Sequence, residues 1–341
     1  MLGILKWFLL SFGIYVVSGL PAEAQPKYNI VFYNVENLFD TKTDPETADG
    51  EFTSFSERHW TYQRFEKKIR MIYKALITAG NGQFPDIIGL AEVENLWVIE
   101  QLVNKTPLNR VQYGIIHKDS PDPRGIDVAL LYRKDRIKPI DYRHIHVSGE
   151  GKYKFRTRDI LHFTAELGKE QIHFFVNHWP SRSGGYIETK EKRDITAGIL
   201  RRSIDSLLIK NPTTNILLMG DFNAAPKEKC FISILKALPY PGNNEPSCLV
   251  NLSTSWTKKA EGTIRNGGQW EIFDQMICSQ NLFHNNLLKI ETDQSGICRF
   301  DFLLEPDPTY LGEKPFRTYL GPKYHGGISD HLPVRLIISE K

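Results

Sequence analysis

The sequence has little cysteine, little net charge and only one long apolar run. Its four cysteines form no Cys-x-x-Cys pair, which argues against a structural zinc site. A net charge of +3 permits a polyanionic partner without requiring one. Repeats, low-complexity tracts and breaks in composition are also missing. We therefore expect a single large domain rather than a repeat array or several linked domains.

The one long apolar run stands at the start of the chain. Lys6 precedes apolar residues that end at Leu20, and an Ala-Glu-Ala motif follows. This pattern is typical of a secretory signal peptide. The run is short for a membrane span, and no cysteine follows it to carry a lipid. We expect cleavage after residues 1–24 and export of 25–341 to the periplasm or medium, without stable membrane insertion; an uncleaved anchor is the alternative.

An exported domain can form disulfide bonds. The cysteines allow three pairings, and the sequence does not choose among them: Cys230, Cys248, Cys278 and Cys298. Cys278 lies in an apolar stretch, so a small buried core residue is an equally good interpretation of it.

Apolar runs typical of strands alternate with stretches of helical spacing. The expected strands are residues 28–35, 85–92, 126–132, 160–168, 171–178, 215–219, 270–277 and 334–338. Helical spacing extends over 61–79, 95–103 and 187–209, whereas 40–58 and 262–268 are polar and irregular. This alternation predicts an α/β fold.

A carboxylate and an amide follow the apolar strand at 215–219. Asp221 and Asn223 are two residues apart, so on extended backbone their side chains share a face. Their oxygen atoms suit a magnesium-type cation, and the amide N–H suits a phosphate oxygen. An Asx turn that caps the strand is the alternative interpretation.

Polar side chains recur where other expected strands end or begin. They are Asn34 and Glu36, Glu92, His178, Asp221 and Asn223, and Asp330 and His331. Ligands collect at the strand ends of α/β sheets. Carboxylates, amides and imidazoles together suit a hydrated Mg²⁺ or Mn²⁺ ion that keeps open positions for phosphate.

These motifs resemble, in order and spacing, those of the endonuclease/exonuclease/phosphatase superfamily, which includes deoxyribonuclease I. The matching stretches are Asn34, Leu90-Ala91-Glu92, Asn177-His178, Gly220-Asp221-Phe222-Asn223, Asp274 and Ser329-Asp330-His331. The resemblance covers about residues 28–338. It implies a four-layered α/β sandwich of two packed mixed β-sheets flanked by helices, and hydrolysis of phosphoric esters with Mg²⁺ or Mn²⁺.

The resemblance also implies roles for individual residues. The metal ligands would be Asn34, Glu92, Asp221 and Asp330. Glu92 would be the principal ligand, and Glu94, on the same strand parity, competes for that role. Asp221 would orient or deprotonate the attacking water, and Asn223 would donate to a phosphoryl oxygen.

Two histidines complete the implied site. His331 resembles the histidine that contacts the scissile phosphate, with Asp274 as its orienting carboxylate. A carboxylate on one imidazole nitrogen fixes the tautomer and raises the pKa. His178 is similar to a second histidine that protonates the leaving oxygen. Asp127 is the nearest candidate for its orienting carboxylate, although a plain turn residue explains Asp127 almost as well.

Several side chains could contact substrate at the rim. Arg182 lies in a Ser-Arg-Ser-Gly-Gly loop that suits bidentate phosphate binding, with a solvated surface arginine as the alternative. Weaker candidates, for phosphate or for base stacking, are Arg124, Arg158, Arg193, Trp60, Trp179 and Trp270.

The sequence thus predicts a monomeric, exported, divalent-metal-dependent phosphodiesterase that acts on nucleic acid by in-line attack of water. The alternatives are a phosphatase or a phospholipid or small-molecule phosphodiesterase with the same site. A non-catalytic binding module on this scaffold is the third hypothesis, because a fold does not determine a function.

Overall fold

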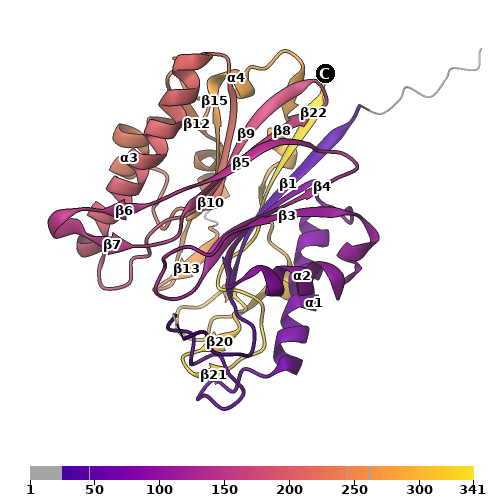
Figure 1. The fold of residues 1–341 in the computed structure, drawn as a ribbon, viewed down its shortest axis with the longest axis vertical. Coiled ribbons are helices and arrows are strands. Elements are labelled where there is room, and N and C mark those ends of the chain that lie inside the picture. Colours follow the sequence, from indigo (N-terminus) through magenta and orange to yellow (C-terminus); the bar gives the residue numbers. More distant parts are fainter. Residues whose placement is uncertain (1–24, 46, 244, 260–261) are drawn as a thin grey trace, which may run out of the picture.

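Two seven-stranded β-sheets pack together at the centre of the protein. The structure is a computed structural model, and it describes residues 25–341 except 46, 244, 260 and 261. The expected signal peptide, residues 1–24, lies outside the described residues. Figure 1 shows helices α1 and α2 beside one sheet and α3 beside the other.

Both sheets are mixed. In spatial order the first sheet is β16 (Leu288–Ile290), β22 (Val334–Glu340), β1 (Lys27–Leu38), β2 (Ile87–Val93), β4 (Asp127–Arg133) and β3 (Tyr113–His117), with β17 (Gly296–Ile297) also on β22. The second is β11 (Ala237–Pro239), β12 (Leu249–Asn251), β15 (Asp274–Ser279), β10 (Asn215–Asp221), β9 (Glu170–His178), β8 (Ile160–Leu167) and β5 (Lys138–Ile145). Short ribbons pair β6 (Ser148–Gly149) with β7 (Phe155–Arg156), β13 (Ile264–Asn266) with β14 (Gln269–Glu271), β18 (Leu304–Pro306) with β19 (Glu313–Pro315), and β20 (Tyr319–Leu320) with β21 (Lys323–Tyr324).

The strands are apolar on both faces because each sheet is covered on both sides. Along β1, Ile30 and Phe32 point into the core between the sheets, where they join Phe163 of β8. Val31 and Tyr33 alternate with them and face the helix-covered side. The protein therefore has the four expected layers, helices, sheet, sheet and helices.

The helices cover the sheets with the faces that the helical spacing predicted. They are α1 (Tyr62–Ala79), α2 (Leu96–Asn104), α3 (Tyr186–Lys210) and the short α4 (Gln280–Phe283). Phe65 of α1 and Leu102 of α2 join the core beneath the first sheet. Leu200 of α3 packs beneath the second. The three long helices are thus confirmed within about one residue of the expected bounds.

One expected strand is wrong, and several observed strands were not expected. The run 270–277 is not one strand, because it divides between β14 in a surface ribbon and β15 in the second sheet. Strand β5 escaped prediction because it is an edge strand with six exposed residues at its start, so it lacks a buried apolar face.

All four cysteines are free and buried, so none of the disulfide pairings that the sequence allows is formed. Cys278 is a core residue between the sheets. Within the described part of the chain, every helix is too short or too polar to span a membrane.

Strand direction brings the predicted site residues to one edge. Strand β1 runs parallel to β2, and β9 runs parallel to β10, so these four strands end together. Strands β15 and β22 run antiparallel to their neighbours, so they begin where the others end. Asp221 lies opposite both His178 and Asp274 in the strand register.

Candidate active site

Four site residues adopt left-handed backbone, which is uncommon outside glycine. The φ angles are 50° at Glu36, 53° at Asn37, 62° at Glu92 and 49° at Asn223. At Glu92 the register between β2 and β4 shifts, as at a β-bulge. Such bulges redirect side chains next to active sites. The sequence did not predict the left-handed backbone at Glu92, because glutamate has no preference for that conformation.

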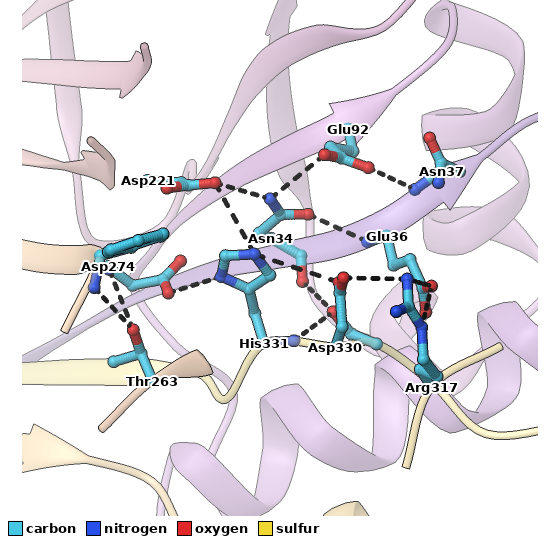
Figure 2. Close-up of polar contacts among 12 residues, drawn as sticks. Asn34, Glu36, Asn37, Glu92, Asp221, Thr263, Asp274, Arg317, Asp330 and His331 are labelled. Carbon is cyan, nitrogen blue, oxygen red and sulfur yellow. Dashed lines mark hydrogen bonds and ion pairs between the residues drawn. The ribbon is translucent and has the colours of Figure 1, made fainter. Parts of the chain in front are cut away.

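Asn34 joins the two carboxylates expected to hold the metal (Figure 2). Its Nδ2 donates to Oδ2 of Asp221 at 3.0 Å and to Oε1 of Glu92 at 3.5 Å. The other oxygen of Glu92 accepts from the backbone N–H of Asn37 at 2.9 Å. The side chains of residues 34, 92 and 221 therefore meet, although 187 residues separate the first from the last.

The competing glutamate turns away from this group. Oε2 of Glu94 accepts from the backbone N–H of Asp40 at 2.6 Å. Burial, with repulsion from nearby acids, raises the pKa of Glu94 to about 8. The structure thus sets Glu92, and not Glu94, beside Asn34.

Asp330 belongs to an ion network that the sequence analysis missed. Nη2 of Arg317 lies 2.8 Å from Oε1 of Glu36 and 3.0 Å from Oδ2 of Asp330 (Figure 2). Burial, and then repulsion from Asp330, raises the pKa of Glu36 to about 7. The buried ammonium of Lys68 donates to the backbone carbonyl of Glu36 and to Oγ1 of Thr318. The positive charges of Arg317 and Lys68 therefore stabilise the acidic residues of this network.

His331 is held by Asp274. Its Nδ1 donates to Oδ2 of Asp274 at 2.7 Å, and its Nε2 lies 3.7 Å from Oδ2 of Asp221. Burial alone would lower the pKa of His331, but Asp274 and Asp221 outweigh it and hold that pKa well above its usual value. The two carboxylates therefore favour the protonated form of the imidazole. Oγ1 of Thr263, in the expected loop, accepts from the N–H groups of Phe273 and Asp274.

His178 lies in the same cluster without an orienting carboxylate. Its Nε2 is 3.5 Å from Oδ2 of Asp221 and 3.8 Å from Oε1 of Glu92. Its Nδ1 is buried and lacks a hydrogen-bond partner among the described residues. The expected partner Asp127 instead accepts from the N–H of Ser120, so that pairing is wrong. Burial, reinforced by nearby arginines, holds the pKa of His178 well below its usual value.

Asp221 is the most shared carboxylate of the site. Its Oδ1 accepts from the N–H of Asn223 at 2.9 Å, and its Oδ2 accepts from the amide of Asn223 at 3.2 Å. That amide also donates to the carbonyl of Trp179. Burial raises the pKa of Asp221 to about 6, although His331 opposes the rise. A carboxylate with a pKa in this range can accept a proton near neutral pH.

Arg182 is bound by protein carboxylates. Its Nη1 lies 2.8 Å from Glu271 and its Nη2 lies 2.8 Å from Glu228. Its Nε donates to the backbone carbonyl of Asn223 at 3.1 Å. To bind phosphate as expected, the guanidinium would have to give up one of these carboxylates.

The weaker rim candidates differ in how deeply their side chains are buried. Trp60 and Trp179 are fully buried, so neither can stack on a base. Arg158 and Arg193 are buried structural residues, and Arg158 pairs with Asp122 at 2.8 Å. Arg124 remains partly exposed. It donates to Oδ1 of Asn37 at 2.7 Å and lies 3.6 Å from Oε2 of Glu92. Trp270 is half-buried between Arg265 and Arg299.

The donor set fits a hard divalent cation. Glu92, Asp221 and Asp330 supply carboxylates beside an amide, and Glu92 and Asp330 keep 12% and 29% of their side chains exposed. A second group is tighter: Asp221, Asp274 and His331 each bring one ligand atom within 4.8 Å of the others, a spacing that the first set does not reach. We favour the first set, because Asp274 and His331 are hydrogen-bonded to each other.

The comparisons agree with this geometry. A model of the endonuclease/exonuclease/phosphatase family matches residues 29–340. None of the curated proteins compared with this chain matches it.

Among solved structures, the human Nocturnin catalytic domain with bound sulfate is 17% identical, with 94% of this chain and 97% of that chain covered and a TM-score of 0.56. TDP2 of D. rerio with a single-strand DNA product is 12% identical, with 92% and 98% covered and a TM-score of 0.54. A Bacteroides vulgatus endonuclease/exonuclease/phosphatase is 12% identical, with 93% and 100% covered and a TM-score of 0.54. These likenesses agree in fold, and the family match spans nearly the whole described chain. This chain belongs to the endonuclease/exonuclease/phosphatase family.

Proposed function

We propose that this protein is an exported, Mg²⁺- or Mn²⁺-dependent phosphodiesterase that cleaves nucleic acid. The observation that carries the proposal is the position of His331, whose imidazole is held by Asp274 and faces Asp221 across 3.7 Å. The proton donor His331 and the proton acceptor Asp221 thus lie next to each other, beside acidic residues that suit a divalent cation. This combination is what hydrolysis of a phosphodiester requires.

Each residue has a distinct part in the proposed reaction. Glu92, Asp330, Asn34 and Asp221 would hold the metal, which when bound neutralises charge on the phosphoryl oxygens. Asp221 orients the attacking water and accepts its proton. His331 donates a hydrogen bond to the phosphoryl group or a proton to the leaving oxygen. His178 is neutral at neutral pH, so it suits hydrogen bonding to phosphate better than proton donation.

A nucleic-acid substrate is supported by a cavity beside the site. It holds about 300 Å³ and is lined by Asn37, Arg58, Arg317 and Thr318 among others. Arg58 and Arg317 are paired with Glu51 and Glu36, so they would have to share their guanidinium groups with the phosphate that follows the scissile one. The similar fold of D. rerio TDP2, which was solved in complex with a single-strand DNA product, supports the same substrate class.

A second candidate is a small phosphodiester or a phospholipid head group. A cavity of about 360 Å³ near Arg124 is lined by five carboxylates, which would repel a long polyanion; they are Asp44, Glu94, Asp119, Asp122 and Asp127. A small substrate that does not extend beyond the catalytic site would avoid this repulsion.

Hydrolysis assays separate these candidates. The mature chain is expected to cleave a chromogenic phosphodiester with Mg²⁺ or Mn²⁺ and to lose this activity in EDTA. Asp221→Asn is expected to lower kcat by roughly 10²–10⁴-fold. Full activity in chelator would contradict the proposal. Single-stranded DNA, RNA, plasmid DNA and sphingomyelin vesicles, each assayed across a salt series, identify the substrate, since nucleic-acid binding weakens steeply with salt.

Export is tested on the expressed full chain. N-terminal sequencing of the protein recovered outside the cytoplasm is expected to begin at Gln25. A mature protein that retains the apolar run would favour the membrane-anchor alternative.

A further inference from the structure

Three side chains gather at the end of β3, outside the proposed catalytic group. His117, Asp119 and Asp127 each bring one ligand atom within 4.8 Å of the others. Nε2 of His117 lies 3.8 Å from Oδ2 of Asp127, and its Nδ1 lies 3.9 Å from Oδ1 of Asp119. None of the proposed catalytic residues belongs to this group.

Strand register explains why these residues meet. Strands β3 and β4 are antiparallel neighbours, and His117 lies opposite Ala129. Asp127 stands two residues before Ala129, so it shares the face of His117 and lies diagonally across from it. Asp119 stands two residues beyond His117, where the chain leaves the strand. The geometry is therefore set by the sheet and not by a flexible surface loop alone.

The imidazole of His117 points to a missing ligand. Its side chain is only 3% exposed, and its Nε2 is buried without a hydrogen-bond partner among the described residues. The 3.8 Å separation from Asp127 is too long for a hydrogen bond. A buried polar atom left unpaired destabilises the folded state, so a group that binds this nitrogen would stabilise the fold.

The carboxylates supply a second reason. Asp127 has a side chain only 4% exposed, so a bound cation would offset the cost of burying its carboxylate. Within the described chain, its Oδ1 accepts from the N–H of Ser120 at 3.0 Å. Asp119 and Asp127 both line the acidic cavity of about 360 Å³, which opens a path for a cation from solvent.

We propose that His117, Asp119 and Asp127 bind a divalent transition-metal ion of the Zn²⁺ or Mn²⁺ class at a site separate from the catalytic one. One imidazole with two carboxylates is a ligand set for such ions, whereas Ca²⁺ and Mg²⁺ prefer oxygen alone. One ligand atom of each residue lies within 4.8 Å of the others, so an ion between them could approach metal–ligand distances of about 2.0–2.2 Å after small side-chain shifts.

The ion would have a structural consequence for the catalytic site. It would tie the end of β3 to the start of β4, and the segment between them carries Arg124. Arg124 contacts Asn37 and lies 3.6 Å from Glu92. A bound ion would therefore order the segment that brings a guanidinium to the rim of the catalytic group.

Metal binding to the whole chain tests this proposal without any measurement of activity. The background is Glu92→Gln, which removes an expected catalytic ligand, and the protein is first stripped with a chelator. Calorimetric titration with Zn²⁺ and the visible spectrum of bound Co²⁺ report the site. Asp119→Asn and His117→Asn in this background are expected to weaken binding by at least about tenfold. Asp141→Asn, an exposed aspartate on β5, is the matched control.

The outcomes are distinct. Loss of the Co²⁺ spectrum in the His117 and Asp119 variants, with the Asp141 control unchanged, supports the site. Equal affinity in all three variants overturns it, as does absence of binding to the Glu92→Gln background. Asp119 has an 81% exposed side chain, so its replacement leaves the fold intact and keeps the test open if His117→Asn fails to fold.

Discussion

Nδ1 of His331 donates to Oδ2 of Asp274 at 2.7 Å, and this bond joins the turn before β22 to the first residue of β15. The two residues come from different sheets, so the bond spans the sandwich at its catalytic edge. It explains why a fully buried imidazole keeps a pKa well above its usual value. Loss of Asp274 should therefore change the pH range in which the enzyme works.

Asp274→Asn is expected to lower kcat by roughly 10²–10⁴-fold, since an amide in place of the orienting carboxylate no longer stabilises the imidazolium. The pKa of His331 is raised in the wild-type protein, so its cation persists as pH rises. In the variant His331 loses its proton at a lower pH. The alkaline limb of the pH profile of kcat should therefore shift to lower pH. A lower kcat with an unmoved limb would contradict this role for Asp274.

Arg317→Gln is expected to destabilise the protein by roughly 2 kcal/mol, because it leaves Glu36 buried without its guanidinium partner. Denaturant unfolding of Arg317→Gln, Glu36→Gln and the double variant measures the coupling. We expect the double variant to be more stable than the sum of the single losses predicts. Arg299→Gln breaks a pair with Glu313, whose side chain is 52% exposed, and should cost under about 1 kcal/mol.

Glu94→Gln is expected to stabilise the protein at pH 8 and not at pH 4. The folded-state pKa of Glu94 is about 8, above its ordinary value of 4.5, so the protonated form favours folding. That contribution is present below about pH 4.5 and is lost as pH rises toward 8. A glutamine does not ionise, so the variant keeps this stability as the pH rises. The difference in melting temperature between variant and wild type should grow by a few degrees across this window.

The matched control for that series is Glu57→Gln, at an exposed position. It should leave the pH dependence of the melting temperature unchanged. A Glu94→Gln protein that loses stability equally at both pH values would mean that Glu94 is ionised and paired in the fold.

Arg182→Met separates two roles for this arginine. Since Arg182 binds Glu228, Glu271 and the backbone carbonyl of Asn223, we expect its loss to displace Asn223 and lower kcat by about tenfold with little change in KM. A direct phosphate ligand would instead raise KM. Arg202→Met, at an exposed position on α3, provides the control.

The sequence by itself determined which residues could share an edge. Asn34, Glu92 and Asp221 each follow an apolar strand, and His331 precedes one, so sheet geometry was enough to expect them together. This inference needed only the two-residue periodicity of strands and the convergence of strand ends in α/β sheets.

Apart from the pair of His331 with Asp274, which the family resemblance implied, only the tertiary structure decided how the site side chains are paired. Arg317 and Glu36 are 281 residues apart, and no local pattern links them. Likewise, no local pattern predicts that Glu228 and Glu271 bind Arg182, or that Asp127 lies apart from His178. The left-handed turn at Glu92, which sets it rather than Glu94 beside Asn34, depends on a register shift between two strands. Such contacts arise when distant segments pack, and packing is a property of the whole chain.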